Sequence, residues 1–347
     1  MEQDRPALFR PLIIDTTLRD GEQTPGLAFS MAEKIHLASM LLDAGVDEIE
    51  AGIPVMGDEE ARYLRHIAKH LPKERIFGWC RLHEKDLEAA EACGMKRIHM
   101  AFPVSTRQLR VLGWDRAILK TRLETLLPLA LSRFDGVSLG FQDATRTPVE
   151  DMLDLLKMLK GFPIRRIRIS DTVGVASPLE ISRLIEKLMK KSPFDLEFHG
   201  HNDLGMATAN ALTALESGAK AVSLTVNGLG ERAGNARLEE LVMALTLKKI
   251  PHGVNTKALR PLSRHVAGLT GCPLPPDKPV TGNRVFTHES GIHCHGQLRD
   301  PLSFQPMEPE IHGLAPVRFM TGKHGGRASL MGEDEGIRNK SLSWVEG

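Results

Sequence analysis

Two histidines separated by one glycine are the residues whose spacing points most directly to chemistry. His199 and His201 belong to the segment HGHND at 199–203, at the end of a short apolar run. Alternate residues of a β-strand face the same side, so both imidazoles can project toward one divalent cation. Two core histidines that only form hydrogen bonds would show the same spacing. The polar strand end favours the metal.

A carboxylate at the end of an earlier apolar run could complete the ligand set. Asp20 follows the run 12–18, and two histidines with one carboxylate and open positions are a common arrangement around a catalytic divalent metal. Asn235 could add a neutral oxygen. Arg19 carries a planar fork of donors that suits an oxyanion or a substrate carboxylate. Gln23 could bind at the same site, or could be a structural hydrogen bonder.

These residues need elements that bring them together. Eight apolar runs, about 30 residues apart, alternate with amphipathic segments, as βα units do. The runs are 12–18, 48–54, 76–80, 97–103, 136–143, 165–172, 196–203 and 221–227. Crossover helices make the strands parallel. Polar residues at many strand ends favour an α/β fold of the (β/α)8 TIM-barrel type, with one shared mouth, over an open doubly wound sheet.

The length of the chain exceeds that of a barrel. We expect a TIM-barrel catalytic domain at 11–250 and a small, mainly helical C-terminal subdomain at 251–347. The second region begins rich in proline and glycine and then carries the histidine-dense segment 286–296.

Composition excludes several classes of function. The chain has 45 Lys+Arg against 44 Asp+Glu, so we expect no nucleic-acid partner and no membrane surface. No apolar stretch reaches about 18 residues, and the N-terminus has no signal-peptide pattern. Four cysteines without a CxxC pair fit a reducing compartment, so we expect a cytoplasmic protein.

Four ordered motifs resemble those of a known family. They are DTTLRDGEQ at 15–23, HGHND at 199–203, the glycine-rich NGLGERAGN at 227–235 and THESGIH at 287–293. Together they resemble the metal-dependent acyltransferases that perform Claisen condensations on acyl-CoA, which include 2-isopropylmalate, citramalate and homocitrate synthases. The segments 52–54, 79–82, 102–105 and 170–174 most resemble homocitrate synthases of the nitrogen-fixation type.

The resemblance implies a mechanism. A 2-oxo acid would chelate a divalent ion (Mg²⁺, Mn²⁺ or Zn²⁺) held by Asp20, His199 and His201, and Arg19 would stabilise the alkoxide. Acetyl-CoA would be the co-substrate. By the same resemblance, His293 would be the general base, would reach the active site of a partner subunit, and would make the enzyme a homodimer.

The resemblance also assigns residues to the substrate. Thr172 matches a position that bonds a substrate carboxylate, and His99 matches a substrate-side histidine of isopropylmalate synthases. Gln142 stands where relatives usually have glutamate, and Phe304 where they commonly have tyrosine. Both departures place the details of catalysis in question.

The favoured function is condensation of acetyl-CoA with 2-oxoglutarate to (R)-homocitrate, followed by thioester hydrolysis. Synthesis of 2-isopropylmalate or citramalate is the alternative, because only the pocket for the tail of the oxo acid differs. An acyl-CoA lyase is disfavoured because the glycine-rich loop has no cysteine. The remaining hypothesis is a metal-binding paralogue that has lost catalytic activity. The family resemblance implies a role in amino-acid biosynthesis, carboxylic acid metabolism or nitrogen fixation.

Overall fold

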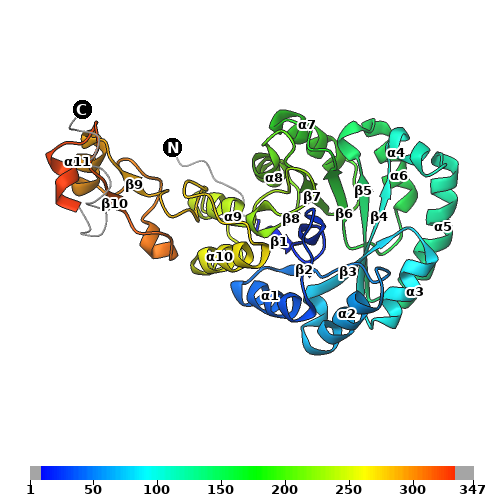
Figure 1. The fold of residues 1–347 in the computed structure, drawn as a ribbon. Coiled ribbons are helices and arrows are strands. Elements are labelled where there is room, and N and C mark those ends of the chain that lie inside the picture. The colour runs from blue at the N-terminus through cyan, green and yellow to red at the C-terminus, as the bar shows by residue number, and fades with distance from the viewer. Residues whose placement is uncertain (1–8, 333–347) are drawn as a thin grey trace. The chain divides into compact units, whose positions relative to one another are not determined.

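The computed structural model describes residues 9–332, which divide into two compact units with the boundary in the sequence between Val254 and Asn255. The first unit is a closed barrel of eight parallel strands in sequence order, so the predicted (β/α)8 TIM barrel is confirmed (Figure 1). The strands are β1 Leu12–Asp15, β2 Glu48–Glu50, β3 Ile76–Arg81, β4 Arg97–Pro103, β5 Gly136–Gln142, β6 Ile167–Asp171, β7 Leu196–Gly200 and β8 Ala221–Leu224.

Helices surround these strands, as Figure 1 shows. They are α1 Met31–Ala44, α2 Asp58–His70, α3 Glu84–Ala92, α4 Thr106–Val111, α5 Arg116–Arg133, α6 Val149–Leu159, α7 Pro178–Met189, α8 Ala207–Glu216 and α9 Leu238–Leu247. Local sequence sets where two of them begin. Ser30 before α1 and Ser177 before α7 each form a capping box with the glutamate three residues on.

Several strands end earlier than the apolar runs predict. β1 ends at Asp15, and the backbone N–H groups of Asp20 and Gly21 both donate to the carbonyl of Thr16, at 2.9 and 3.0 Å. The chain therefore turns sharply after the strand. This turn, and not the strand itself, carries Arg19 and Asp20 over the C-terminal end of the barrel, where TIM-barrel active sites lie.

Strand alternation gives the barrel an unusual interior. In β7, Leu196 and Phe198 are fully buried apolar residues, whereas Glu197 and His199 on the opposite face contact other polar residues. Ile14, Phe77 and Ala221 form an apolar cluster on neighbouring strands. The middle of the barrel is therefore polar and requires paired charges, because an unpaired buried charge is strongly destabilising.

Buried ion pairs meet this requirement. Within residues 9–332, four arginines and four carboxylates form one connected series: Arg97, Glu48, Arg166, Glu197, Arg168, Glu50, Arg19 and Asp20. Each neighbouring pair in this order is an ion pair. We call this set the interior charge network; it leads to the predicted metal ligand Asp20.

Helices supply most of the regular structure of the second unit. It contains α10 Leu259–Thr270 and α11 Gly291–Arg299, and a small parallel sheet of β9 Thr287–His288 and β10 Arg318–Phe319. The remaining regular structure consists of short 3₁₀ turns. None of the helices in the described part of the chain combines the length and apolar character needed to cross a bilayer.

Candidate metal centre and active site

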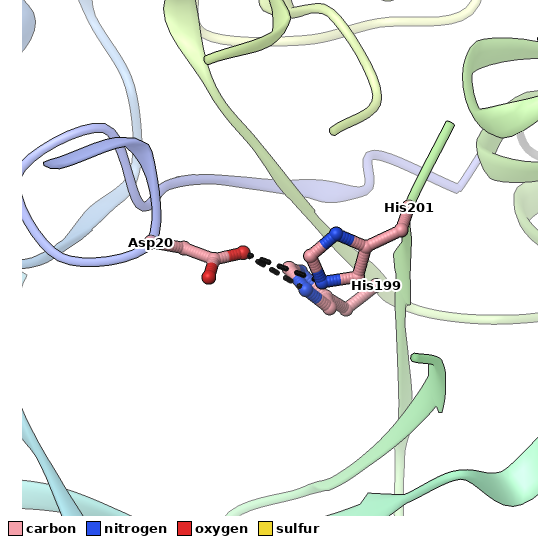
Figure 2. A group of neighbouring side chains, drawn as sticks. All are labelled: Asp20, His199 and His201. Atoms are coloured by element: carbon pink, nitrogen blue, oxygen red, sulfur yellow. Dashed lines mark ion pairs between the residues drawn. The ribbon is translucent and has the colours of Figure 1, made fainter. Parts of the chain in front are cut away.

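Asp20, His199 and His201 converge at the C-terminal mouth of the barrel. Oδ2 of Asp20 lies 3.2 Å from Nε2 of His199 and 3.7 Å from Nε2 of His201. Figure 2 shows the carboxylate facing both imidazoles, which come from the end of β7 and the residue just beyond it. All three are buried, and one ligand atom from each lies within 4.8 Å of the others.

The electrostatics of these groups suit a cation. Burial raises the pKa of Asp20, but Arg19 and the two imidazoles outweigh it and hold the pKa well below its usual range. Burial, followed by the neighbouring His199, lowers the pKa of His201 to about 4. The site therefore presents an ionised carboxylate with a neutral imidazole, which are the protonation states that metal ligation needs.

Buried atoms without partners give an independent test of the fit. Among residues 9–332, Oδ1 of Asn235 and the Nδ1 atoms of His199 and His201 have no hydrogen-bond partner, and Oδ2 of Asp20 faces the two imidazoles. Such atoms are rare in folded proteins and often mark a missing ion or water. Asn235 lies beside His201 through a backbone bridge, and its Nδ2 donates to the carbonyl of Leu229 at 2.8 Å. The donor set fits a divalent ion.

Arg19 is held beside this centre by three groups. Its Nε donates to Glu50, its Nη1 donates to Oδ1 of Asp20 at 3.0 Å, and its guanidinium carbon lies 5.5 Å from the centre of the Trp79 ring. A longer contact of 3.5 Å joins Nη1 to Gln23. Burial raises the pKa of Glu50, but Arg168 and Arg19 bring it down to about 2. Glu50 is therefore ionised and fixes the orientation of Arg19.

A cavity of about 240 Å³ opens at these residues. It brings together Arg19, Asp20, Gln23, His99, Gln142, Thr172, His199 and His201, as the sequence motifs implied. It is also lined by residues to which the sequence assigned no individual role, namely Trp79, Ala101, Arg168, Ser170, Glu231 and Arg232. Of these, only Ala101 and Arg168 lie outside the motifs that resemble the family. Asn235 is not among the lining residues.

His99 is fixed in the wall of this cavity by its neighbours. Nδ1 of His99 lies 2.9 Å from Oγ of Ser138, and that hydroxyl is also 3.4 Å from the carbonyl of Ile98. Nε2 has no partner. Gly140 leaves room for it, because a Cβ there would lie 2.5 Å from Nε2. Burial, and then the charge of Arg168, lowers the pKa of His99 well below its ordinary value, so the imidazole is neutral.

Thr172 and Arg232 shape the rim of the cavity. The backbone N–H of Asp143 donates to Oγ1 of Thr172 at 2.8 Å, which leaves the hydroxyl proton free to donate to a substrate. Arg232, in the glycine-rich loop, donates to Asp203 and to the backbone carbonyl of Thr172, both at 2.8 Å. Gly234 lets this loop close, because a Cβ there would lie 1.9 Å from the carbonyl oxygen of Gly228.

Among the missed residues, Arg168 carried a signal that could have been used. It alternates with Ile167 and Ile169 in a predicted strand, so its side chain lies on the face opposite these two residues, and an arginine on one face of a buried strand needs polar partners. The apolar residues of 165–172 predict the strand but say nothing of its arginines. Trp79 and Arg232 lie within the motifs at 79–82 and 227–235, but their type and spacing assign no role to either.

His293 belongs to the second unit. It lies on α11, it is exposed, and its ring stacks on Phe304 with the ring centres 4.3 Å apart. Its proposed role as a base supplied to a partner subunit stays a prediction. Phe304 therefore packs directly on the predicted base.

Comparison with known proteins agrees with the motifs and the barrel. The HMGL-like family model matches residues 10–266, and a model described as homocitrate synthase post-HMGL domain-like matches residues 280–337. The homocitrate synthase of Frankia alni is 45% identical over 91% of this chain and 90% of its own length.

A second sequence relative and a solved structure are also similar to this chain. The 2-isopropylmalate synthase 2 of Caldanaerobacter subterraneus subsp. tengcongensis is 40% identical over 95% of this chain and 85% of its own length. The crystal structure of HMG-CoA lyase from Bacillus subtilis superposes with a TM-score of 0.69 at 22% identity, over 78% of this chain and 97% of that chain. This last likeness shows the fold. By its family match and its relatives, the chain belongs to the HMGL-like family, in the group of condensing acyltransferases that includes the homocitrate and 2-isopropylmalate synthases.

Proposed function

We propose that this enzyme condenses acetyl-CoA with 2-oxoglutarate and water to give (R)-homocitrate and coenzyme A. The family relationship supports the reaction class. The polar cavity supports the choice of oxo acid, and this observation carries the proposal. Ala101 and Trp79 are the apolar members of its lining, whereas a branched alkyl tail would need mostly apolar walls.

Asp20, His199 and His201, with Asn235 as a further oxygen ligand, would hold the divalent ion, which we propose is Mg²⁺, Mn²⁺ or Zn²⁺. Such an ion, when bound, polarises the keto group of the oxo acid as a Lewis acid. The donor set of two nitrogens and carboxylate or amide oxygens is compatible with each of these ions.

Arg19 stabilises the charge that develops during the condensation. Glu50 and Asp20 hold its guanidinium in place before substrate arrives, so no reorganisation is needed when the keto oxygen becomes negative. Thr172 offers its hydroxyl proton to the carboxylate next to the keto group. Gln23 and Gln142 line the same cavity and supply neutral hydrogen-bonding groups.

The base that removes a methyl proton from acetyl-CoA is proposed to be His293 of a partner subunit. An imidazole suits this task because its ordinary pKa lies near neutral pH. This role makes the enzyme a homodimer. We further propose a cytoplasmic location and, from the motifs that match the nitrogen-fixation type, a role in supplying homocitrate for nitrogen fixation.

Thiol release from acetyl-CoA tests the proposal, with Mg²⁺ or Mn²⁺ present and 2-oxoglutarate, 2-oxoisovalerate, pyruvate and oxaloacetate compared at equal concentration. We expect the highest kcat/KM with 2-oxoglutarate and a product with the mass of homocitrate. Turnover of 2-oxoisovalerate alone would instead identify a 2-isopropylmalate synthase. No release with any acid would indicate a protein that has lost catalysis.

A further inference from the structure

Arg168 lies one layer below the metal-binding residues on the wall of the same cavity. It precedes Ser170 by two positions on β6, so both side chains face the barrel interior, and both line the cavity. The register pairs Ser170 with His199 and Arg168 with Glu197 on the neighbouring strand β7. Arg168 is thus a buried cation, 2% exposed, deeper in the barrel than His199.

Two carboxylates hold the Arg168 guanidinium in one orientation. Its Nε donates to Oε1 of Glu197, and its Nη2 lies 2.7 Å from Oε2 of Glu50. Within residues 9–332, Nη1 donates no hydrogen bond, and Nη2 is ion-paired with Glu50 but also makes no hydrogen bond. A guanidinium on the wall of a cavity that uses only its Nε in a hydrogen bond has N–H groups available for a further acceptor.

The charge balance of the barrel indicates what that acceptor is. The interior charge network pairs four arginines with four carboxylates and is neutral by itself. A divalent ion at Asp20 would leave two positive charges in excess. A substrate with two carboxylates cancels both charges, whereas an acid with an alkyl tail cancels one, and charges interact strongly in a buried site.

The spacing suits a five-carbon diacid. Two residues along a strand cover about 6.6 Å, which is the offset between the layer of Arg168 and the layer of Ser170 and His199. The two carboxyl carbons of extended 2-oxoglutarate lie about 5 Å apart, given C–C bonds of about 1.5 Å. The difference between these two distances is spanned by a hydrogen bond from the long Arg168 side chain to the second carboxylate.

We infer that Arg168 is a specificity-determining residue that binds the carboxylate at the end of the 2-oxo acid remote from the keto group, and so selects diacids. This inference rests on the proposed function and names the residue that sets its substrate class. Glu50 and Glu197 are positioning residues for Arg168. Ser170 and the unpartnered Nε2 of His99 complete the polar wall around the tail.

A matched pair of substitutions tests the assignment. Arg168→Lys keeps the buried charge but loses the fork of donors, and Arg168→Gln loses both. Arg166→Lys is the control, because Arg166 also pairs with Glu197 but does not line the cavity. In Arg168→Gln we expect KM for 2-oxoglutarate to rise by at least about 30-fold, with kcat/KM for pyruvate changed by less than about threefold. Arg168→Lys should show a smaller rise in the same KM, and Arg166→Lys should show the wild-type selectivity.

A substrate analogue removes the dependence on variant folding. The 5-methyl ester of 2-oxoglutarate keeps the metal-chelating end and loses the tail charge. Wild-type enzyme should bind it at least about 30-fold more weakly than the diacid in calorimetric titration, and Arg168→Gln should lose this discrimination.

Equal affinity of wild-type enzyme for ester and diacid would overturn the inference, as would a folded Arg168→Lys or Arg168→Gln with wild-type selectivity. These results are separable from failure of the proposed function. If wild-type enzyme does not turn over 2-oxoglutarate, the proposed function itself fails. If wild-type enzyme prefers 2-oxoglutarate while the Arg168 variants keep that preference, the assignment of Arg168 alone fails.

Discussion

Buried, fixed side chains decide what the barrel mouth can do. Asp20 is ionised, His201 is neutral, and Arg19 is oriented by Glu50 before any substrate binds. These states follow from burial and from neighbouring charges, which are the factors that shift pKa values in proteins.

Replacement of His201 by alanine should remove metal and activity together. The substitution deletes one of the three groups that meet at the centre, so bound metal after gel filtration should fall well below one equivalent. His70→Ala, at an exposed position on α2, is the matched control and should keep both metal and turnover. Metal content by mass spectrometry decides the matter, and unchanged content in His201→Ala would remove this residue from the ligand set.

Gly140→Ala should disturb His99. The added Cβ would meet Nε2 of a fully buried imidazole at 2.5 Å, and overpacking of this kind costs about 1–3 kcal/mol. Gly268→Ala on α10 is the opposite case, because nothing lies within 4 Å of its Cβ, and it should stabilise the protein by about 0.5–1 kcal/mol. Urea unfolding of both variants measures the difference. If the two variants unfold with equal free energy, the space that Gly140 leaves beside His99 is not needed for stability.

Some residues of this site could be predicted from the sequence, and others could not. The spacing of His199 and His201 predicted a shared ligand face because strand alternation is geometric. Arg168 has the same geometry, but the segment 165–168 contains three arginines, and the sequence does not show which of them lines the cavity, because the two glutamates that hold Arg168 lie on other strands. Ion pairs between residues on different strands can be assigned only when the closed barrel shows which side chains face each other.

At the level of elements, strand ends depart most from prediction. The apolar runs located all eight strands, yet β1 and β8 are shorter than their runs. The residues beyond these two strands form turns. The carbonyl of Thr16 accepts hydrogen bonds from the backbone N–H groups of Asp20 and Gly21, and Asn227 has a left-handed backbone with φ of 60°. Local hydrophobicity cannot distinguish a strand from the buried turn that follows it, because both are sequestered from water.

Capping predicts a purely structural effect on α7. Ser177→Ala removes the hydroxyl that accepts from the backbone N–H of Glu180 and should lower the free energy of unfolding by about 0.5–2 kcal/mol. Because Ser177 does not line the cavity, KM and kcat should not change. Ser132→Ala, on the exposed face of α5, should change stability by less than about 0.5 kcal/mol. A change in KM without a change in stability would contradict this view of Ser177.

At the scale of the whole molecule, the two units divide the predicted tasks. The barrel carries the metal ligands and the cavity, and the second unit carries His293. The net charge of +1 gives almost no general attraction for anionic substrates, so the local groups at the mouth must supply it.

A base supplied across a subunit boundary predicts complementation between inactive variants. His201→Ala and His293→Ala should each be inactive, and a mixture refolded or exchanged to equilibrium should recover about a quarter of wild-type activity. Half of randomly mixed dimers then carry one intact site of two. His293→Ala alone should retain its metal. Absence of recovery in a mixture shown by mass spectrometry to contain heterodimers would place the base within the same chain.

The most direct test of the central claim is a metal titration of the condensation itself. Chelator-treated protein is supplied with acetyl-CoA and 2-oxoglutarate, and thiol release and product mass are followed as Mn²⁺ is added. We predict no release above background without metal, and activity that saturates as about one ion binds per chain, with homocitrate as product. Undiminished thiol release from the metal-free protein, or saturated metal binding with no homocitrate formed, would contradict the account.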